Sequence, residues 1–340
     1  MAKNHVSRSV IYYKRMIAAV LAVIILSLAG LSVVFGVRLR STRAALAEAQ
    51  DELFERDLAD MQAQAQAEAE RLRNAVQPER VKPAGELSAP EILSGTTVIA
   101  HALGDVDGNS GLNCLEAFQA HYAAGVRVFE VDMRMSTDGR VILRHDWNST
   151  LQEGIDSLHL PTVEGFRSTP ILGQYTPLTF RDLLLLMAEY PDICVITDTK
   201  YTEPEAVTAE FQAMVDDAHT LGLSYLFDRM IVQVYSPNNY SVVDNVHHFP
   251  HYIYTLYQDY FGGDEDSFRN KVDFCAEHGI MGLTLNSKLW NSDYAAIADR
   301  SEIGVYLHTV NDRDAARRFL RTGVRAVYSD MLTPEDLEAD

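Results

Sequence analysis

Residues 126–133, Val-Arg-Val-Phe-Glu-Val-Asp-Met, decide the fold, because they combine a β-strand pattern with two carboxylates. Valine and phenylalanine are typical of strands. Alternate side chains of a strand point to the same side, so Glu130 and Asp132 share one face and Val128 continues that face toward an interior. Buried unpaired carboxylates are costly, whereas a hard cation such as Mg²⁺ or Ca²⁺ binds them through their oxygens. The stretch therefore predicts a strand that carries a metal site.

Similar short β-rich runs alternate with helical stretches through residues 96–340. This alternation is typical of a parallel sheet or barrel, and about 245 residues suit a TIM-type (β/α)₈ barrel. We expect nine strands, one more than a closed barrel needs, so either one lies outside the barrel or the barrel is irregular. The expected strands are residues 97–103, 126–133, 141–144, 193–198, 230–235, 252–257, 281–285, 305–310 and 326–328.

Polar side chains suited to catalysis lie at the C-terminal ends of the first four of these runs. His101 lies on the first run, His145 follows the third, and Asp198 and Lys200 lie at the end of the fourth. In a barrel of this type the C-terminal ends of the strands form the active-site face. A single histidine or aspartate is more often structural, but six ionisable groups at one end of four successive strands favour a site. Asp198 adds a third oxygen ligand for a cation.

The first 95 residues differ in composition from the rest. Residues 16–37 follow a short N-terminal segment, 1–15, and carry no charge over 22 positions, which as a helix span about 33 Å and cross a bilayer. We expect a transmembrane helix; the alternative is a cleaved signal peptide, whose apolar region is usually only about 7 to 15 residues. Residues 38–77 contain no glycine or proline and predict a helical stalk, and residues 78–95 contain three prolines and two glycines, the composition of a linker.

The charges around this apolar segment indicate how it is oriented. Four lysines and arginines precede it and three arginines follow it closely, a slight excess that favours a cytoplasmic N-terminus and an extracytoplasmic barrel. A thin stripe of small apolar side chains along the stalk is compatible with a homo-oligomer, and a solvated spacer is the alternative.

The overall charge limits the partners of the protein. Asp and Glu outnumber Lys and Arg by 48 to 29, a net charge of -19, which argues against a nucleic-acid partner because binding to phosphate backbones depends on clustered cationic side chains. A small phosphorylated substrate remains compatible, because one lysine and a bound cation can hold a phosphate. Cys114, Cys194 and Cys275 are far apart and lack metal-ligand spacing, so we expect buried thiols.

Short motifs follow one another in a specific order from His101 to Asp330. They are His101 with Gly104, Asn113, Leu115-Glu116-Ala117-Phe118, Gly125, Phe129-Glu130-Val131-Asp132, Thr137-Asp138-Gly139, Val141, His145-Asp146, Pro177-Leu178-Thr179, Asp198-Thr199-Lys200, Thr309-Val310-Asn311, Gly323-Val324 and Ser329-Asp330. In this order the motifs resemble the glycerophosphodiester phosphodiesterase family, which shares its barrel with phosphatidylinositol-specific phospholipase C and sphingomyelinase D. The resemblance covers nearly all of residues 97–335.

This resemblance implies roles for the site residues. His101 and His145 match the general acid-base histidines of the family, and Glu130 and Asp132 match its metal-binding Glu-x-Asp. On the fourth strand Asp198 replaces the usual Glu, a variant similar to sphingomyelinase D, and Lys200 is retained for the phosphate. The implied reaction is attack on phosphorus by water or by a neighbouring hydroxyl of the substrate, with His101 as base and His145 as acid.

The sequence also departs from the family pattern near the substrate. The usual His-Arg-Gly is His-Ala-Leu-Gly at 101–104, and Pro-Glu-Asn is Gly-Leu-Asn at 111–113. A phosphate-contacting arginine and a site glutamate are therefore missing, which puts the substrate in question more than the chemistry. His308 occupies the position of an expected aromatic residue. We expect the substrate pocket to be lined by Tyr235, Tyr252, Trp290, His308 and the insert 151–175.

Two other interpretations of the barrel compete with a phosphodiesterase. A glycoside hydrolase needs two carboxylates on opposite sides of a sugar bond, whereas Glu130 and Asp132 share one strand face and suit a metal better. A degenerate barrel that is held at a membrane as a binding module is also compatible with the missing arginine and glutamate. A nearby bilayer favours a glycerophosphodiester, a lysophospholipid or a related lipid-derived or envelope substrate.

Overall fold

The computed structural model describes residues 77–257 and 264–338, together with Met16 and Leu21. The chain forms two compact units, residues 1–63 and 64–340, and the barrel belongs to the second. The expected transmembrane helix and stalk lie outside the described residues, apart from Met16, Leu21 and Gln77. Within the described part of the chain, no helix combines the length and the apolar composition needed to cross a membrane.

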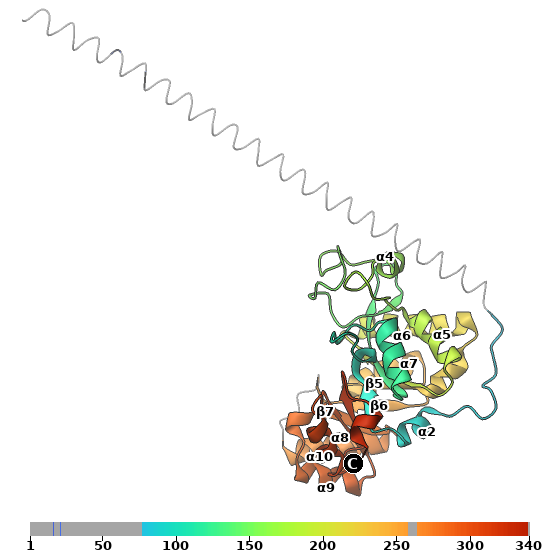
Figure 1. Cartoon of the computed structure of the whole chain (residues 1–340), viewed down its shortest axis with the longest axis vertical. Coiled ribbons are helices and arrows are strands. Elements are labelled where there is room, and N and C mark those ends of the chain that lie inside the picture. Colours follow the sequence, from blue (N-terminus) through green and yellow to red (C-terminus); the bar gives the residue numbers. More distant parts are fainter. Residues whose placement is uncertain (1–15, 17–20, 22–76, 258–263, 339–340) are drawn as a thin grey trace, which may run out of the picture. The chain divides into compact units, whose positions relative to one another are not determined.

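Eight parallel strands close into a barrel, as the sequence predicted (Figure 1). The barrel closes because the first strand pairs on one side with the second and on the other with the last, through Ala100 opposite Phe129 and Val98 opposite Val327. The barrel strands are β1 (Val98–Ala100), β2 (Val128–Met135), β4 (Cys194–Thr199), β5 (Met230–Val234), β6 (Tyr252–Thr255), β7 (Gly282–Asn286), β8 (Gly304–His308) and β9 (Ala326–Ser329).

The ninth expected strand lies outside the barrel. β3 (Val141–Leu143) pairs antiparallel with the end of β2, with Met133 opposite Leu143. The turn between them contains Gly139 at a φ of 73°, a conformation that glycine adopts without strain. This hairpin accounts for the surplus strand, so the barrel itself needs no irregularity.

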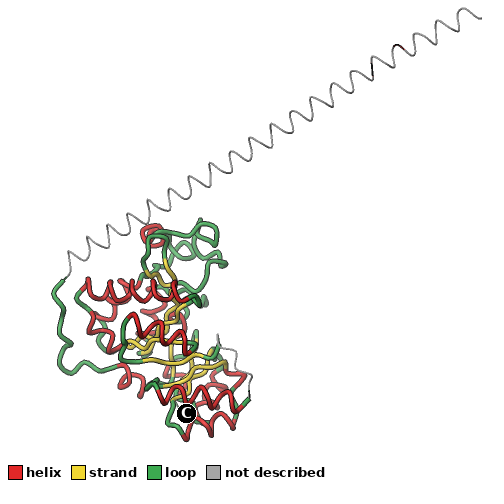
Figure 2. Tube along the Cα trace, turned by 180° about the vertical axis from the view of Figure 1, so that it is seen from behind, coloured by secondary structure: helices red, strands yellow, loops and turns green. Residues whose placement is uncertain are grey.

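Helices cover the outside of the barrel, and Figure 2 shows the strands enclosed by them. Most follow a strand and bury one apolar face against it, as α5 does with Phe180, Leu183 and Met187. The helices of the barrel unit are α3 (Leu115–Ala123), α4 (Val163–Ser168), α5 (Phe180–Glu189), α6 (Pro204–Leu221), α7 (Pro237–Val246), α8 (Glu265–Glu277), α9 (Ser292–Arg300), α10 (Arg313–Leu320) and α11 (Pro334–Leu337), with 3₁₀ turns η1 (His101–Leu103), η2 (Ser224–Arg229) and η3 (Ser287–Leu289).

The segment predicted as a linker packs against the barrel. It contains α2 (Ala89–Ser94), which begins with a capping box between Ser88 and Glu91. Its buried side chains pack in one apolar cluster with strand residues of the barrel such as Val128 and Ile196. They belong to Ala89, Ile92 and Leu93. α2 therefore closes the N-terminal end of the barrel, opposite the end at which the site residues lie.

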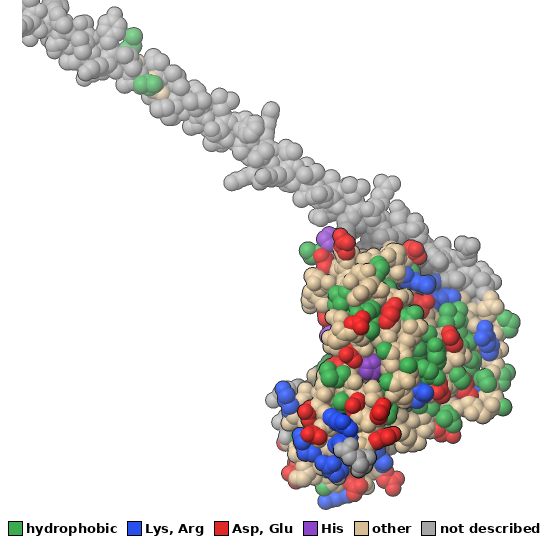
Figure 3. Space-filling view, in the orientation of Figure 1, with side chains coloured by type: hydrophobic (Ala, Val, Ile, Leu, Met, Phe, Trp, Pro, Cys, Tyr) green, Lys and Arg blue, Asp and Glu red, His purple; other side chains and the backbone are tan. Residues whose placement is uncertain are grey.

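The insert 151–175 is mostly loop and carries only the short helix α4. The face of the molecule drawn in Figure 3 mixes acidic with basic side chains, with most of the basic ones over the region of α8 to α10. The net negative charge of the chain therefore does not give this face an electrostatic potential of a single sign.

Candidate active site

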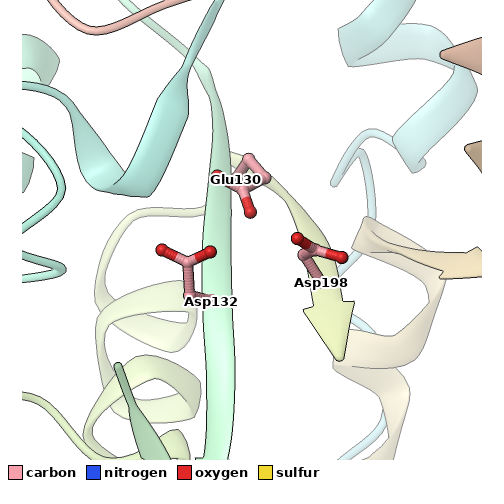
Figure 4. A group of neighbouring side chains, drawn as sticks. All are labelled: Glu130, Asp132 and Asp198. Carbon is pink, nitrogen blue, oxygen red and sulfur yellow. The ribbon is translucent and has the colours of Figure 1, made fainter. Parts of the chain in front are cut away.

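Three carboxylates meet at the C-terminal end of the barrel on two neighbouring strands (Figure 4). Glu130 and Asp132 come from β2 and Asp198 from β4, and the strand register places Asp132 beside Asp198. One oxygen of each carboxylate lies within 4.8 Å of those of the other two, and the three residues are only 3%, 1% and 6% exposed. The structure thus brings together all three residues that we predicted as metal ligands.

Two amide side chains orient these carboxylates. Nδ2 of Asn113 donates to Oδ2 of Asp132 at 2.7 Å, and the backbone N–H of Asp132 donates to Oδ1 of Asn113 at 3.0 Å. Nε2 of Gln233 donates to Oδ1 of Asp198 at 2.7 Å. Sequence reasoning assigned no role to either amide; Asn113 stood in a family motif, whereas Gln233 gave a signal only through its inward position on the fifth strand.

Lys200 lies within the carboxylate cluster. Its Nζ forms ion pairs with Asp198 and, at 2.6 Å, with Oδ1 of Asp132. Burial opposes the charged form of Lys200, but the two aspartates outweigh it and raise its pKa. Burial and the charge of Asp132 raise the pKa of Glu130 to about 8. Three carboxylates and one ammonium leave two negative charges when all are ionised, so these residues fit a divalent cation with hard oxygen ligands, such as Mg²⁺ or Ca²⁺.

The turn after β1 positions the first histidine and contacts the cluster through its backbone. In η1, Ala102 has a φ of 49° and a ψ of 41°, a left-handed conformation that costs a non-glycine residue roughly 1–2 kcal/mol. This conformation directs the N–H of Ala102 to Oε2 of Glu130 at 2.8 Å. Gly104 follows at a φ of 96°, and a Cβ there would lie 2.2 Å from the ring of His121. The turn therefore requires glycine at this position.

His101 is held by a carboxylate from the other end of the barrel sequence. Its Nδ1 lies 2.7 Å from Oδ1 of Asp330, and Oδ2 of Asp330 accepts from Nδ2 of Asn311 at 2.6 Å. Burial opposes protonation of His101, but the bond to Asp330 and the charges of Glu130 and Asp132 outweigh it and raise its pKa to about 9. With Nδ1 engaged, Nε2 is the ring nitrogen left for a substrate.

His145 follows β3 and is oriented by its neighbour in the sequence. Its Nδ1 lies 2.9 Å from Oδ2 of Asp146, and the side chain is 56% exposed. Oδ1 of Asp146 accepts from the backbone N–H groups of Asn148 and Ser149 at 2.7 and 2.9 Å. Burial opposes the ionised form of Asp146, but the bonds from His145 and from these N–H groups outweigh it and lower its pKa. Both candidate acid-base histidines therefore carry a carboxylate on Nδ1.

A cavity of about 300 Å³ connects the two histidines with the carboxylate cluster. His308 lines it, as we expected, and burial together with the positive charges of His101 and Lys200 lowers the pKa of His308 to about 4. His308 is therefore neutral at pH 7. The lining residues are His101, Glu130, His145, Asp198, Lys200, Gln233, Thr255, Tyr257, Asn286, His308 and Tyr328.

Four of the expected pocket elements do not line this cavity. Tyr252 turns its hydroxyl to Oδ1 of Asp244 at 3.1 Å. Trp290 lines a different hollow, and its Nε1 donates to Oγ1 of Thr322 at 2.9 Å. Tyr235 turns its hydroxyl to the carbonyl of Tyr201 at 2.7 Å and is 8% exposed. The insert 151–175 contributes none of the lining residues. The aromatic residues lie outside the cavity because an aromatic side chain near a strand end can satisfy its polar atom against the neighbouring backbone or helix.

The two departures from the family pattern are buried among apolar residues. The side chains of Ala102 and Leu112 are 0% and 1% exposed and belong to the core. They place no polar group in the cavity, so nothing at these two positions replaces the missing arginine and glutamate.

Cation binding should depend on pH, because Glu130 has to lose its proton to act as a ligand. Since its pKa is about 8, we expect the apparent affinity for Mg²⁺ or Ca²⁺ to rise about tenfold per pH unit up to that value.

The stability of the cation-free protein should also depend on pH. Between about pH 4.3 and pH 8 the folded protein keeps the proton of Glu130, whereas the unfolded chain has released it. The cation-free protein therefore loses stability as the pH rises toward 8. His101 acts in the same direction, because its stabilising proton is lost as the pH rises from about 6.5 through 9. The measurement is the Tm with and without cation at pH 6 and pH 8.5; an equal Tm increase at both pH values would contradict the assignment of Glu130 as a ligand.

Comparison with known proteins agrees with this fold. The model of the glycerophosphoryl diester phosphodiesterase family matches residues 108–333. Among solved structures, a phosphodiesterase from Oleispira antarctica in complex with the product sn-glycerol-3-phosphate is similar at a TM-score of 0.57 and 16% identity, over 74% of this chain and 98% of that one. A glycerophosphodiester phosphodiesterase from Parabacteroides distasonis has a TM-score of 0.56 and 17% identity, over 72% of this chain and 95% of that one. No match was found among curated proteins.

The barrel carries buried carboxylates and two carboxylate-bound histidines at one end, groups that are suited to chemistry on a phosphate ester. The family match covers well over half of the chain. The chain belongs to the glycerophosphoryl diester phosphodiesterase family and is a phosphodiesterase.

Proposed function

We propose that this enzyme cleaves a small phosphodiester by paired histidine catalysis at a divalent cation site. One observation carries the proposal: His101 and His145, each with Nδ1 on a carboxylate, line the same cavity as the carboxylate cluster and Lys200. A binding module has no need for two histidines fixed in this way around buried carboxylates. A glycoside hydrolase is disfavoured because Asp132 and Asp198 are both paired with Lys200.

The two histidines have complementary roles. We assign His101 as the base that accepts the proton of the attacking hydroxyl and His145 as the acid that protonates the leaving alkoxide, each contributing roughly 10²- to 10⁴-fold. Lys200 lines the cavity and neutralises negative charge on the phosphoryl oxygens of the substrate. A bound divalent cation would further stabilise that charge. A cation that compensated the charges of Glu130 and Asp132 would also lower the pKa of His101 and so favour the neutral imidazole that a base requires.

The opposite wall of the cavity suggests the class of alcohol. The carboxyl groups and the lysine of the lining come from β2 and from the end of β4, whereas β6, β7 and β8 contribute Thr255, Asn286 and the neutral His308. Oγ1 of Thr255 and Nε2 of His308 are buried and have no hydrogen-bond partner among the described residues. We infer that this wall binds an uncharged, hydroxyl-bearing alcohol. The sn-glycerol-3-phosphate in the similar Oleispira structure supports such a ligand.

The test is a product assay with a panel of substrates, with cation and with chelator. The panel contains diesters of glycerol phosphate with glycerol, inositol and choline, a lysophospholipid and phosphatidylinositol. We expect cation-dependent turnover that favours hydroxylated alcohols over choline, and phosphorus NMR separates a hydrolysed product from a cyclic phosphate formed by an internal hydroxyl. Absence of turnover of every diester, with Mg²⁺ and with Ca²⁺, would overturn the proposal.

We also propose that the enzyme acts at a membrane, with residues 16–37 as the anchor, residues 38–77 as a stalk, the N-terminus in the cytoplasm and the barrel on the opposite side. The uncharged run of 22 residues and the flanking cationic residues support this arrangement. Alkaline carbonate extraction of membranes from cells that express the full chain tests it. Release of the chain into the supernatant would contradict the anchor.

A further inference from the structure

We propose that Arg144 and Gln152 are positioning residues that fix the catalytic orientation of His145 by linking it to the insert 151–175; this inference rests on the proposed function, because it takes His145 as a catalytic residue. His145 is more than half exposed, so burial does not fix its orientation. The neighbouring backbone has to do so, and Arg144 organises that backbone.

Arg144 is a fully buried cation immediately before His145. It is 1% exposed, and its backbone N–H donates to the carbonyl of Asp132 at 2.9 Å, which holds the backbone of Arg144 against β2. Its Nε donates to the carbonyl of Asp146 at 2.7 Å, and Nη2 donates to the carbonyl of Ser149 at 2.8 Å. These two bonds hold the carbonyl groups of the turn 146–149. The Asp146 carboxylate accepts from N–H groups of the same turn. Arg144 therefore stabilises the turn that positions the carboxylate bound to Nδ1 of His145.

Gln152 connects this turn to the insert. Nη1 of Arg144 donates to Oε1 of Gln152 at 3.1 Å, and Nε2 of Gln152 donates to the carbonyls of Phe166 and Thr169 at 3.0 and 2.6 Å. Gln152 is 3% exposed, so the side chain that makes these bonds is itself buried. Phe166 lies on α4 and is fully buried, which anchors the bridge in a packed part of the insert.

This bridge gives the insert a function that differs from the one we expected. The insert does not line the catalytic cavity, and neither do Arg144 and Gln152. Among the described residues, the guanidinium of Arg144 donates its hydrogen bonds only to oxygens of one turn and of one glutamine. A buried cation bound in this way is costly to maintain for packing alone. Its contacts converge on the turn that carries His145 and Asp146, so the geometry assigns it to the orientation of that pair.

The test is a double-mutant cycle between Arg144→Met and His145→Ala, measured with a radiolabelled diester so that residual rates are detectable. We expect Arg144→Met to lower kcat by about 10²-fold, the scale of a misplacement of about 1 Å, with little change in KM. In the His145→Ala background the same substitution should have almost no further effect on kcat, because its effect acts through the imidazole. Arg144→Lys, which keeps part of the bonding, should recover part of the rate, and Gln152→Met should lower kcat in the same direction.

Arg140→Met is the matched control. Arg140 lies in the same hairpin and pairs with the buried Asp217 at 2.9 Å, away from the turn of His145. We expect it to leave kcat unchanged in both backgrounds, and thermal melting shows whether each variant is folded. If His145→Ala retains the wild-type rate, the proposed function fails. If His145→Ala is impaired but Arg144→Met lowers kcat by the same factor in both backgrounds, the proposed function stands and the positioning role is overturned. If Arg144→Met does not fold, Gln152→Met in the same cycle decides between these outcomes.

Discussion

Replacement of His101 by alanine should lower kcat by roughly 10²- to 10⁴-fold, the contribution of one acid-base group. The physical reason is that Nε2 of His101 is the nitrogen left for a substrate once Nδ1 is bound to Asp330, 2.7 Å away. The substitution removes proton transfer but leaves the carboxylates and Lys200 in place, so substrate binding should change less than kcat. The measurement is steady-state kinetics at saturating cation with the best diester of the panel.

Two further variants make this result specific. Asp330→Asn keeps the imidazole but removes the charge that holds it, so it should lower the pKa of His101 and reduce kcat less than His101→Ala does. His159→Ala is the matched control, because His159 also pairs through Nδ1 with an aspartate, at 3.0 Å, but is 70% exposed on the insert. It should leave kcat unchanged. A loss of kcat of only about threefold in His101→Ala would be far smaller than the loss expected for an acid-base group. That result would contradict a catalytic role of His101.

The sequence predicted the barrel and the acidic half of the site because both follow from local periodicity. Alternation along the second strand put Glu130 and Asp132 on one face, and the parallel order of strands brought Asp198 to the same end. The surplus strand was also expected, and the structure places it in the hairpin of β2 and β3. These features depend on residues only a few positions apart or on the repeated strand-helix pattern.

The partners of the site residues could not be predicted in the same way. The bond between His101 and Asp330 joins residues 229 positions apart, and it forms only because the last strand returns beside the first. Asn113 contacts Asp132 through a left-handed backbone at a φ of 50°, for which the sequence gives no periodic signal. Trp290 lies outside the cavity although we expected it there, because the sequence gives its position along the chain but not the direction of its side chain.

The segment before the barrel shows a similar limit, because its prolines and glycines indicated a linker whereas its charged residues pack. Glu86 forms an ion pair with Arg229 at 3.0 Å, and the two side chains are 4% and 1% exposed. Arg229 also donates through Nη1 to the carbonyl of Ile193 at 3.0 Å and through Nη2 to that of Met187 at 2.5 Å. One cation therefore joins the segment that leads into α2 to the loop before β4.

Arg229→Met should consequently lower the free energy of unfolding of the barrel by about 3–5 kcal/mol, the usual cost of removing one partner of a buried ion pair. Most of this cost arises because the Glu86 carboxylate is left buried without its cation, so the double variant Glu86→Leu with Arg229→Met should recover part of the loss. Lys82→Met is the matched control, because Lys82 pairs with Asp228 in the same region at side-chain exposures of 32% and 35%. Exposed pairs contribute only about 0–1 kcal/mol. Urea unfolding of the wild type, the two single variants and the double variant measures these differences. If Arg229→Met and Lys82→Met lowered the free energy of unfolding by amounts that agree within about 1 kcal/mol, the buried pair would not be what holds α2 and its preceding segment.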